Sequence, residues 1–126
     1  MSNSTKLFLI LIFTGCAILG FMIKLPRVFH YYDKELHACF YFFALLFLTA
    51  LYPKKWTIIS ILLFGFGFAI ELAQEFSNQI SLRLTGKKIH GNFDVLDIKY
   101  NLIGLMLGIV VFLLFRGLFM NNFNKA

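Results

Sequence analysis

The sequence predicts an all-α integral membrane protein with four transmembrane helices in one compact bundle. Of its 126 residues, 60% are hydrophobic and 17 are Phe, and the mean hydropathy is +0.79, whereas soluble domains are about 45–50% apolar. The apolar residues form four runs, which a soluble domain of this length is too small to bury. Because a backbone inside a bilayer must satisfy its own hydrogen bonds, we expect each run to be a helix.

The first two spans are separated by a polar gap. We expect the first over residues 7–23, an uncharged run between Lys6 and Lys24 that reaches the short end of the length needed to cross a hydrocarbon core about 30 Å thick. The second is expected over residues 36–52, and it ends where the Pro-Lys-Lys sequence of residues 53–55 interrupts the apolar run. Both runs have the composition of membrane-crossing helices.

The third and fourth spans enclose the longest predicted connection. We expect the third span over residues 56–75, with Glu71 near its end, and the fourth over residues 98–119. Between them, part of residues 77–93 alternates apolar with polar side chains, which predicts a short strand or a surface helix along the membrane interface. The sequence shows no repeat, so we expect residues 1–126 to form a single transmembrane domain.

The charge pattern argues against one class of partner and for another. A formal net charge of +6 on a soluble protein would suggest nucleic acid, but here the basic residues flank apolar runs. In that position Lys and Arg act as topology signals and contact the head groups of anionic lipids. We therefore expect membrane lipids as partners and no nucleic acid.

Side chains capable of chemistry gather on one side of the membrane. All six acidic residues and all three histidines lie beside the first and third gaps between spans, which share a membrane face if every run crosses. Those gaps also hold seven of the twelve Lys and Arg residues, so a plain count would place that face in the cytoplasm. We interpret these basic residues as part of a site instead. The prediction is a polar face outside the membrane, with both termini in the cytoplasm.

A stripe on the fourth span combines polar chemistry with helix packing. Asp94, Asp97, Asn101, Gly104 and Gly108 are spaced by 3, 4, 3 and 4 positions, so they share one helix face. The glycines allow a neighbouring helix to approach closely. The polar residues face the same neighbour, and Asn101 needs a hydrogen-bonding partner there. A packing stripe with an incidental polar end is the alternative interpretation.

Two further stripes place polar residues at the same membrane level. The third span carries Glu71 and Gln74, and a carboxyl at that depth is costly unless it faces protein or water. The second begins near Asp33, Lys34 and His37, although Asp33 also fits a helix cap and His37 an interfacial side chain. We expect the three stripes to converge on one pocket formed by Asp33, His37, Glu71, Gln74, Asp97 and Asn101.

The order and spacing of these motifs resemble those of the VanZ-like membrane proteins. The resemblance covers roughly residues 26–112 and rests on three motifs: Asp33-Lys34-x2-His37, Glu71-x2-Gln74 and Asp94-x2-Asp97-x3-Asn101-x2-Gly104-x3-Gly108. The family also tends to have an Arg shortly before its acidic motif. In this sequence Arg83 stands eleven positions ahead of Asp94, so three residues remain open for that basic role: Arg83, Lys87 and Lys88.

The resemblance implies a role at the bacterial cell envelope. The family's namesake is associated with resistance to the glycopeptide antibiotic teicoplanin, and most relatives have no assigned reaction. An outward-facing polar site near lipid-linked cell-wall precursors or anionic lipids suits such a role.

Two classes of function stay open. In the first, a non-enzymatic envelope protein binds a lipid head group or a lipid-linked wall precursor, its basic residues pairing phosphate or carboxylate. The ligand-binding residues would be Asp33, Lys34, Gln74, Arg83 and Asn101. In the second, a small intramembrane hydrolase or transferase transfers protons through His37, Glu71, Asp94 and Asp97. Transport is a weaker third idea, since four short helices leave little room for alternating access.

The sequence offers little support for a nucleophile or a tightly bound metal. It lacks the G-x-S-x-G and H-E-x-x-H motifs and shows no paired Cys and His. Zinc normally takes more His or Cys ligands than a lone His37 supplies, so no metal site is predicted. The carboxylate oxygens suit Mg²⁺ or Ca²⁺, and such a divalent cation is the one alternative to having no cofactor.

Overall fold

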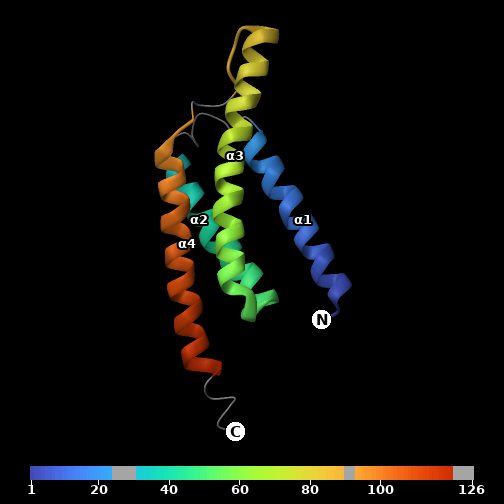
Figure 1. The fold of residues 1–126 in the computed structure, drawn as a ribbon, viewed down its shortest axis with the longest axis vertical. Helices are drawn as coiled ribbons and strands as arrows, with labels where there is room; N and C mark the ends of the chain where they lie inside the picture. The colour runs from blue at the N-terminus through green and yellow to red at the C-terminus, as the bar shows by residue number, and fades with distance from the viewer. Residues whose placement is uncertain (24–30, 90–92, 121–126) are drawn as a thin grey trace.

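The computed structural model describes residues 1–23, 31–89 and 93–120, which are almost entirely helical (Figure 1). The elements in chain order are α1 (Asn3–Met22), α2 (Asp33–Leu51), the 3₁₀ turn η2 (Pro53–Lys55), α3 (Trp56–Thr85), α4 (Val95–Phe115) and the π-helical turn η3 (Arg116–Met120). The four α-helices are all long and apolar enough to cross a membrane. The predicted class, an all-α membrane protein with four spanning helices, is confirmed.

Polar residues outside the apolar runs begin the first and last helices. The Ser2 hydroxyl accepts a hydrogen bond from the Thr5 backbone N–H (3.2 Å) at the start of α1. The Asp94 carboxylate accepts one from the Leu96 N–H (2.8 Å) at the start of α4. Such caps satisfy backbone donors that have no partner inside the helix. For this reason both helices begin a few residues ahead of the apolar spans predicted for them.

The third helix is longer than its apolar run, which corrects the prediction for residues 77–93. It continues to Thr85 and ends at Gly86, whose φ of 72° is the left-handed conformation that glycine adopts readily after a helix. The same segment also fits a helical pattern, because apolar side chains recur at a spacing of four: Phe76, Ile80 and Leu84. Residues 77–85 are therefore a continuation of α3 and not a separate strand or surface helix.

Helices α2 and α4 pack more extensively than any other pair of described helices. A Cβ added at Gly104 would collide with the backbone carbonyl oxygen of Ala38, and one added at Gly108 would lie 2.8 Å from a methyl carbon of Leu45. Because the contact positions advance together along both chains, the two helices run in the same direction. The missing side chains bring the two backbones into contact.

The apolar core lies between α2, α3 and α4, and its buried members are Tyr41, Ala44, Leu45, Ile59, Leu63 and Leu105. Helix α1 packs more loosely and diverges from α3 toward its N-terminal end (Figure 1). Its contacts are largely aromatic, as where the Phe13 ring stacks on those of Phe40 and Phe47. The outer faces of all four helices carry exposed apolar side chains, as expected for contact with lipid.

We predict that Gly104→Ala destabilises the bundle by about 1–3 kcal/mol, the usual cost of overpacking, because the new methyl group would push α4 away from the Ala38 carbonyl. Gly65→Ala is the matched control, since no atom lies within 4 Å of a Cβ added at Gly65. Thermal melting in detergent measures both variants. Equal melting temperatures for the two would show that the α2–α4 contact is less tight than described.

We also predict that the two ends of α3 lie on opposite sides of the membrane. Lys54 precedes the helix and Lys87 follows it. With Cys16 and Cys39 replaced by Ser, a single Cys at position 54 should react with an impermeant maleimide from one side only, and a single Cys at position 87 from the other. The side that labels position 87 in intact cells also tests the predicted outer location of the polar face. Labelling of both positions from the same side is incompatible with a spanning α3.

Candidate functional site

Two helix starts bring the acidic and histidine side chains together at one end of the bundle. On α2, Asp33 and His37 are four residues apart and share a face, and Asp97 and Asn101 have the same spacing on α4. Both helices begin at this end, and the close approach at Gly104 lies about one turn further along. The two polar faces are therefore held against each other.

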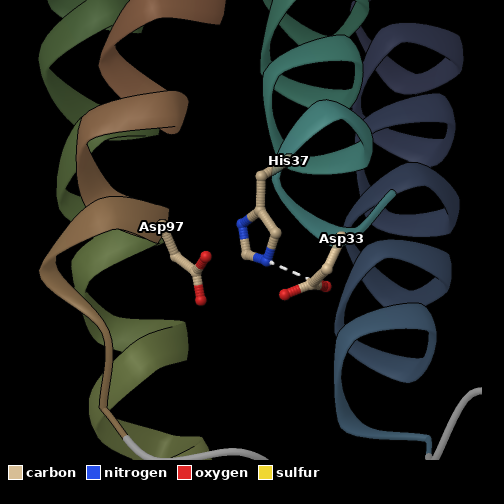
Figure 2. A group of neighbouring side chains, drawn as sticks. All are labelled: Asp33, His37 and Asp97. Carbon is tan, nitrogen blue, oxygen red and sulfur yellow. Dashed lines mark ion pairs between the residues drawn. The ribbon is translucent and has the colours of Figure 1, made fainter. Parts of the chain in front are cut away.

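The imidazole of His37 lies at the centre of this cluster. Its Nδ1 is 2.9 Å from the Oδ1 of Asn101, and the two residues are only 4% and 1% exposed. Its Nε2 is 3.8 Å from the Oδ1 of Asp33. Figure 2 shows the ring between the carboxylates of Asp33 and Asp97. One ligand-type atom from each of these three side chains lies within 4.8 Å of the others, an arrangement able to hold a cation.

Helix α3 closes the cluster with one carboxylate and one glycine. Glu71 is 2% exposed and interacts electrostatically with Asp97. Gly67 lies one turn earlier, where an added Cβ would be 2.6 Å from the Nδ2 of Asn101 and 2.9 Å from the hydroxyl oxygen of Tyr41. Gly67 thus leaves room for two polar groups between the helices.

Several buried polar atoms of the cluster have no hydrogen-bond partner among the described residues. They are the hydroxyl oxygen of Tyr41, one carboxylate oxygen each of Glu71 and Asp97, and the Nδ2 of Asn101. An unsatisfied buried group of this kind costs about 1–3 kcal/mol, and more when charged. In native structures such atoms are explained by an ordered water or ion, a catalytic role or local strain.

Asp94 and Lys34 form the rim of the cluster. The Nζ of Lys34 lies 3.4 Å from one Asp94 oxygen, and both side chains are more than a third exposed. The other Asp94 oxygen accepts the Leu96 N–H at the start of α4. Asp94 is therefore engaged in an ion pair and a helix cap, whereas the carboxylates of Glu71 and Asp97 are buried and each keep an unpartnered oxygen.

Gln74 and Arg83 are not part of the cluster. The Nε2 of Gln74 donates a hydrogen bond of 2.8 Å to the Phe21 carbonyl, which fastens the end of α1 to α3. Arg83 is exposed and stands twelve residues beyond Glu71 on α3, about 18 Å further along the helix axis. The structure brings together five of the six residues expected to converge: Asp33, His37, Glu71, Asp97 and Asn101.

Three residues of the cluster were not among the predicted site residues. Tyr41 lies one turn after His37 on the same face of α2, and Gly67 lies one turn before Glu71, so helical spacing alone contains a signal for both. Phe21 packs its ring 5.1 Å from the imidazole. No sequence signal distinguishes this Phe from the sixteen others, because its role depends on where α1 lies.

No protein-family model matches the chain, and neither a curated protein nor a solved structure matches it. The resemblance to the VanZ-like proteins therefore rests on the quoted motifs alone. Function has to be inferred from a cluster that combines an imidazole, carboxylates, a carboxamide and a phenol at one end of a membrane-type bundle.

We predict that Asn101→Ala lowers the melting temperature in detergent, because it removes the hydrogen bond that joins α4 to His37 on α2. Polar contacts between membrane helices contribute about 0.6 kcal/mol on average and at most near 2 kcal/mol. Gln79→Ala on the exposed face of α3 is the control and should melt like the wild type. An unchanged melting temperature for Asn101→Ala would mean that the bond is not part of what holds the helices together.

Proposed function

We propose that this chain is a VanZ-like bacterial envelope protein that binds the polar head group of a lipid or a lipid-linked cell-wall precursor at the outer face of the cytoplasmic membrane. The observation that carries the proposal is the surplus of buried polar atoms beside His37 that lack hydrogen-bond partners in the described part of the chain. Polar groups that only hold membrane helices together normally satisfy one another. A surplus of donors and acceptors supports a polar ligand.

The position of the cluster suits a ligand that is itself anchored in the bilayer. The cluster lies where α2 and α4 begin, with Glu71 added from α3, and all three helices are apolar enough to span a membrane. Beside them Leu36 and Leu96 are 39% and 47% exposed on the outer surface. Acyl chains can pack on such a surface while the head group enters between the helix ends.

The charge of the cluster limits how a head group binds. Its carboxylates are those of Asp33, Glu71 and Asp97, and Lys34 is already paired with Asp94. Hydroxyl, amide or amine groups of a wall precursor can donate hydrogen bonds to these carboxylates directly. A phosphate needs a bridging cation to approach them, and a divalent cation held by the carboxylate oxygens would serve.

A small intramembrane hydrolase or transferase is the second candidate, and the surroundings of His37 favour it. An imidazole beside carboxylates is suited to general acid–base catalysis, since one group can orient or charge-balance the other during proton transfer. The Nε2 of His37 faces the Asp33 carboxylate, and the Asp97 carboxylate lies on the other side of the ring. Turnover of a lipid-linked substrate by the purified protein would favour this candidate over simple binding.

We predict that His37→Gln and Asp97→Asn abolish function while the protein stays folded, since Gly104 and Gly108 already join α2 to α4 independently of these side chains. The measurement is teicoplanin susceptibility of a host that expresses the protein, together with the amount of folded protein in its membranes. Tolerance conferred by the wild type should fall to the host baseline in both variants. Native mass spectrometry should show lipid retained by the wild type and lost from the variants.

Glu35→Gln is the matched control for both measurements, because Glu35 is exposed on α2 beside the cluster residues. It should retain the wild-type tolerance and the bound lipid. A loss of tolerance that merely follows the loss of folded protein would mean that the cluster acts only in stability. Full tolerance in the two cluster variants would exclude the cluster as the binding site.

A further inference from the structure

Three side chains, two from α2 and one from α4, each bring one metal-ligand atom close to the other two. The atoms come from Asp33, His37 and Asp97 and lie within 4.8 Å of one another. Ligands around one Zn²⁺ ion have bonds of about 2.0–2.2 Å, which places neighbouring ligand atoms roughly 3.4 Å apart. The Asp33 side chain is 45% exposed, so this carboxylate can rotate toward the other two ligand atoms without disturbing the core.

The orientation of His37 is set by a residue behind it. The carboxamide oxygen of Asn101 accepts only, so the Nδ1 at 2.9 Å carries the proton and donates it. In a neutral imidazole the lone pair of Nε2 then faces the Asp33 carboxylate, 3.8 Å away, and the Asp97 carboxylate lies on the other side of the ring (Figure 2). Histidines that bind metals are held in this way, one ring nitrogen donating to an outer partner while the other binds the ion.

A second observation points to a cation at the same place. Asp97 is only 8% exposed, and its carboxylate points toward the imidazole. Its Oδ1 has no hydrogen-bond partner among the described residues. Glu71, 2% exposed, adds a further buried carboxylate that interacts with Asp97. Carboxylates gathered in an apolar interior repel one another and have lost their hydration, and a bound cation offsets both costs.

We propose that Asp33, His37 and Asp97 form a binding site for one divalent transition-metal ion, Zn²⁺ in the simplest case, with Asn101 orienting the imidazole. Mg²⁺ and Ca²⁺ prefer sites made of oxygen alone, whereas an imidazole nitrogen selects for the transition metals. A lone His37 supplies too few ligands for zinc, and the carboxylates of Asp33 and Asp97 provide the two others.

Three protein ligands leave a coordination position open, as in sites where zinc binds a water molecule or a substrate oxygen. A head-group phosphate would bind the ion through this position, and only that statement rests on the proposed function. The metal site itself requires no lipid. The alternative is that Nε2 also carries a proton, so that a positively charged imidazolium balances the carboxylates. In that case the protein would have no metal affinity at this site.

The test uses the full chain in detergent, without added lipid, after removal of metals with a chelator. Titration with Co²⁺ should produce visible absorption bands that saturate at one ion per chain, and one equivalent of Zn²⁺ should abolish them. Zn²⁺ should also raise the melting temperature. Mg²⁺ and Ca²⁺ at the same concentration should change neither readout.

Variants assign the ligands. Asp33→Asn, at the exposed edge, and His37→Gln should each weaken Zn²⁺ binding by more than the approximately 10–100-fold that Asn101→Ala costs as an outer partner. Asn101→Ala should in addition alter the Co²⁺ spectrum. Glu35→Gln is the control and should bind as the wild type does.

Three results would overturn the site: no Co²⁺ bands in the wild type, equal affinity in Asp33→Asn and Glu35→Gln, or displacement of Zn²⁺ by an equal concentration of Mg²⁺ or Ca²⁺. Because no lipid is present, failure here leaves the test of lipid retention unaffected. Conversely, metal binding with no lipid retained would support this site and count against the proposed function.

Discussion

The contact between the backbones of α2 and α4 is the constraint on which the rest of the structure depends. The missing side chain of Gly104 lets the Ala38 carbonyl approach, and Gly108 allows the same for Leu45. Lipid tails are as apolar as the helices they surround, so close van der Waals contact and interhelical hydrogen bonds must hold such a bundle together. About one turn from Gly104, the same closeness brings His37 within hydrogen-bonding distance of Asn101.

Burying the polar cluster costs folding free energy, and helix packing alone does not explain why it is there. Burying ionisable groups in an apolar interior rarely adds net stability, and well-packed apolar side chains often serve as well or better. Yet Glu71 and Asp97 are buried at 2% and 8% exposure, and each keeps an unpartnered oxygen in the described part of the chain. This surplus of polar atoms, together with the orientation of the imidazole, supports the proposed ligand and distinguishes the cluster from ordinary interhelical hydrogen bonding.

Helix α3 shows where local sequence patterns mislead. The apolar run predicts its membrane-crossing part but not its end, because Gly86 and the spacing of later apolar residues carry α3 to Thr85. Gln74 was expected beside Glu71, yet three residues correspond to less than a full turn and rotate its side chain by about 60°. That rotation directs it to the Phe21 carbonyl of α1. Helical spacing in the sequence showed which residues lie on roughly the same face of α3, whereas the positions of the neighbouring helices decided which residue each one contacts.

By itself, the sequence determined the class of the protein, its four spans and the faces on which polar residues and glycines lie. Long apolar runs in a bilayer admit only helices, and spacings of three and four define one face whatever the neighbour is. Only the tertiary structure decided the partners: Asn101 with His37, Phe21 against the imidazole, and Gly67 beside Tyr41. His37 and Asn101 are 64 positions apart, and their meeting depends on how whole helices pack, which no local pattern records.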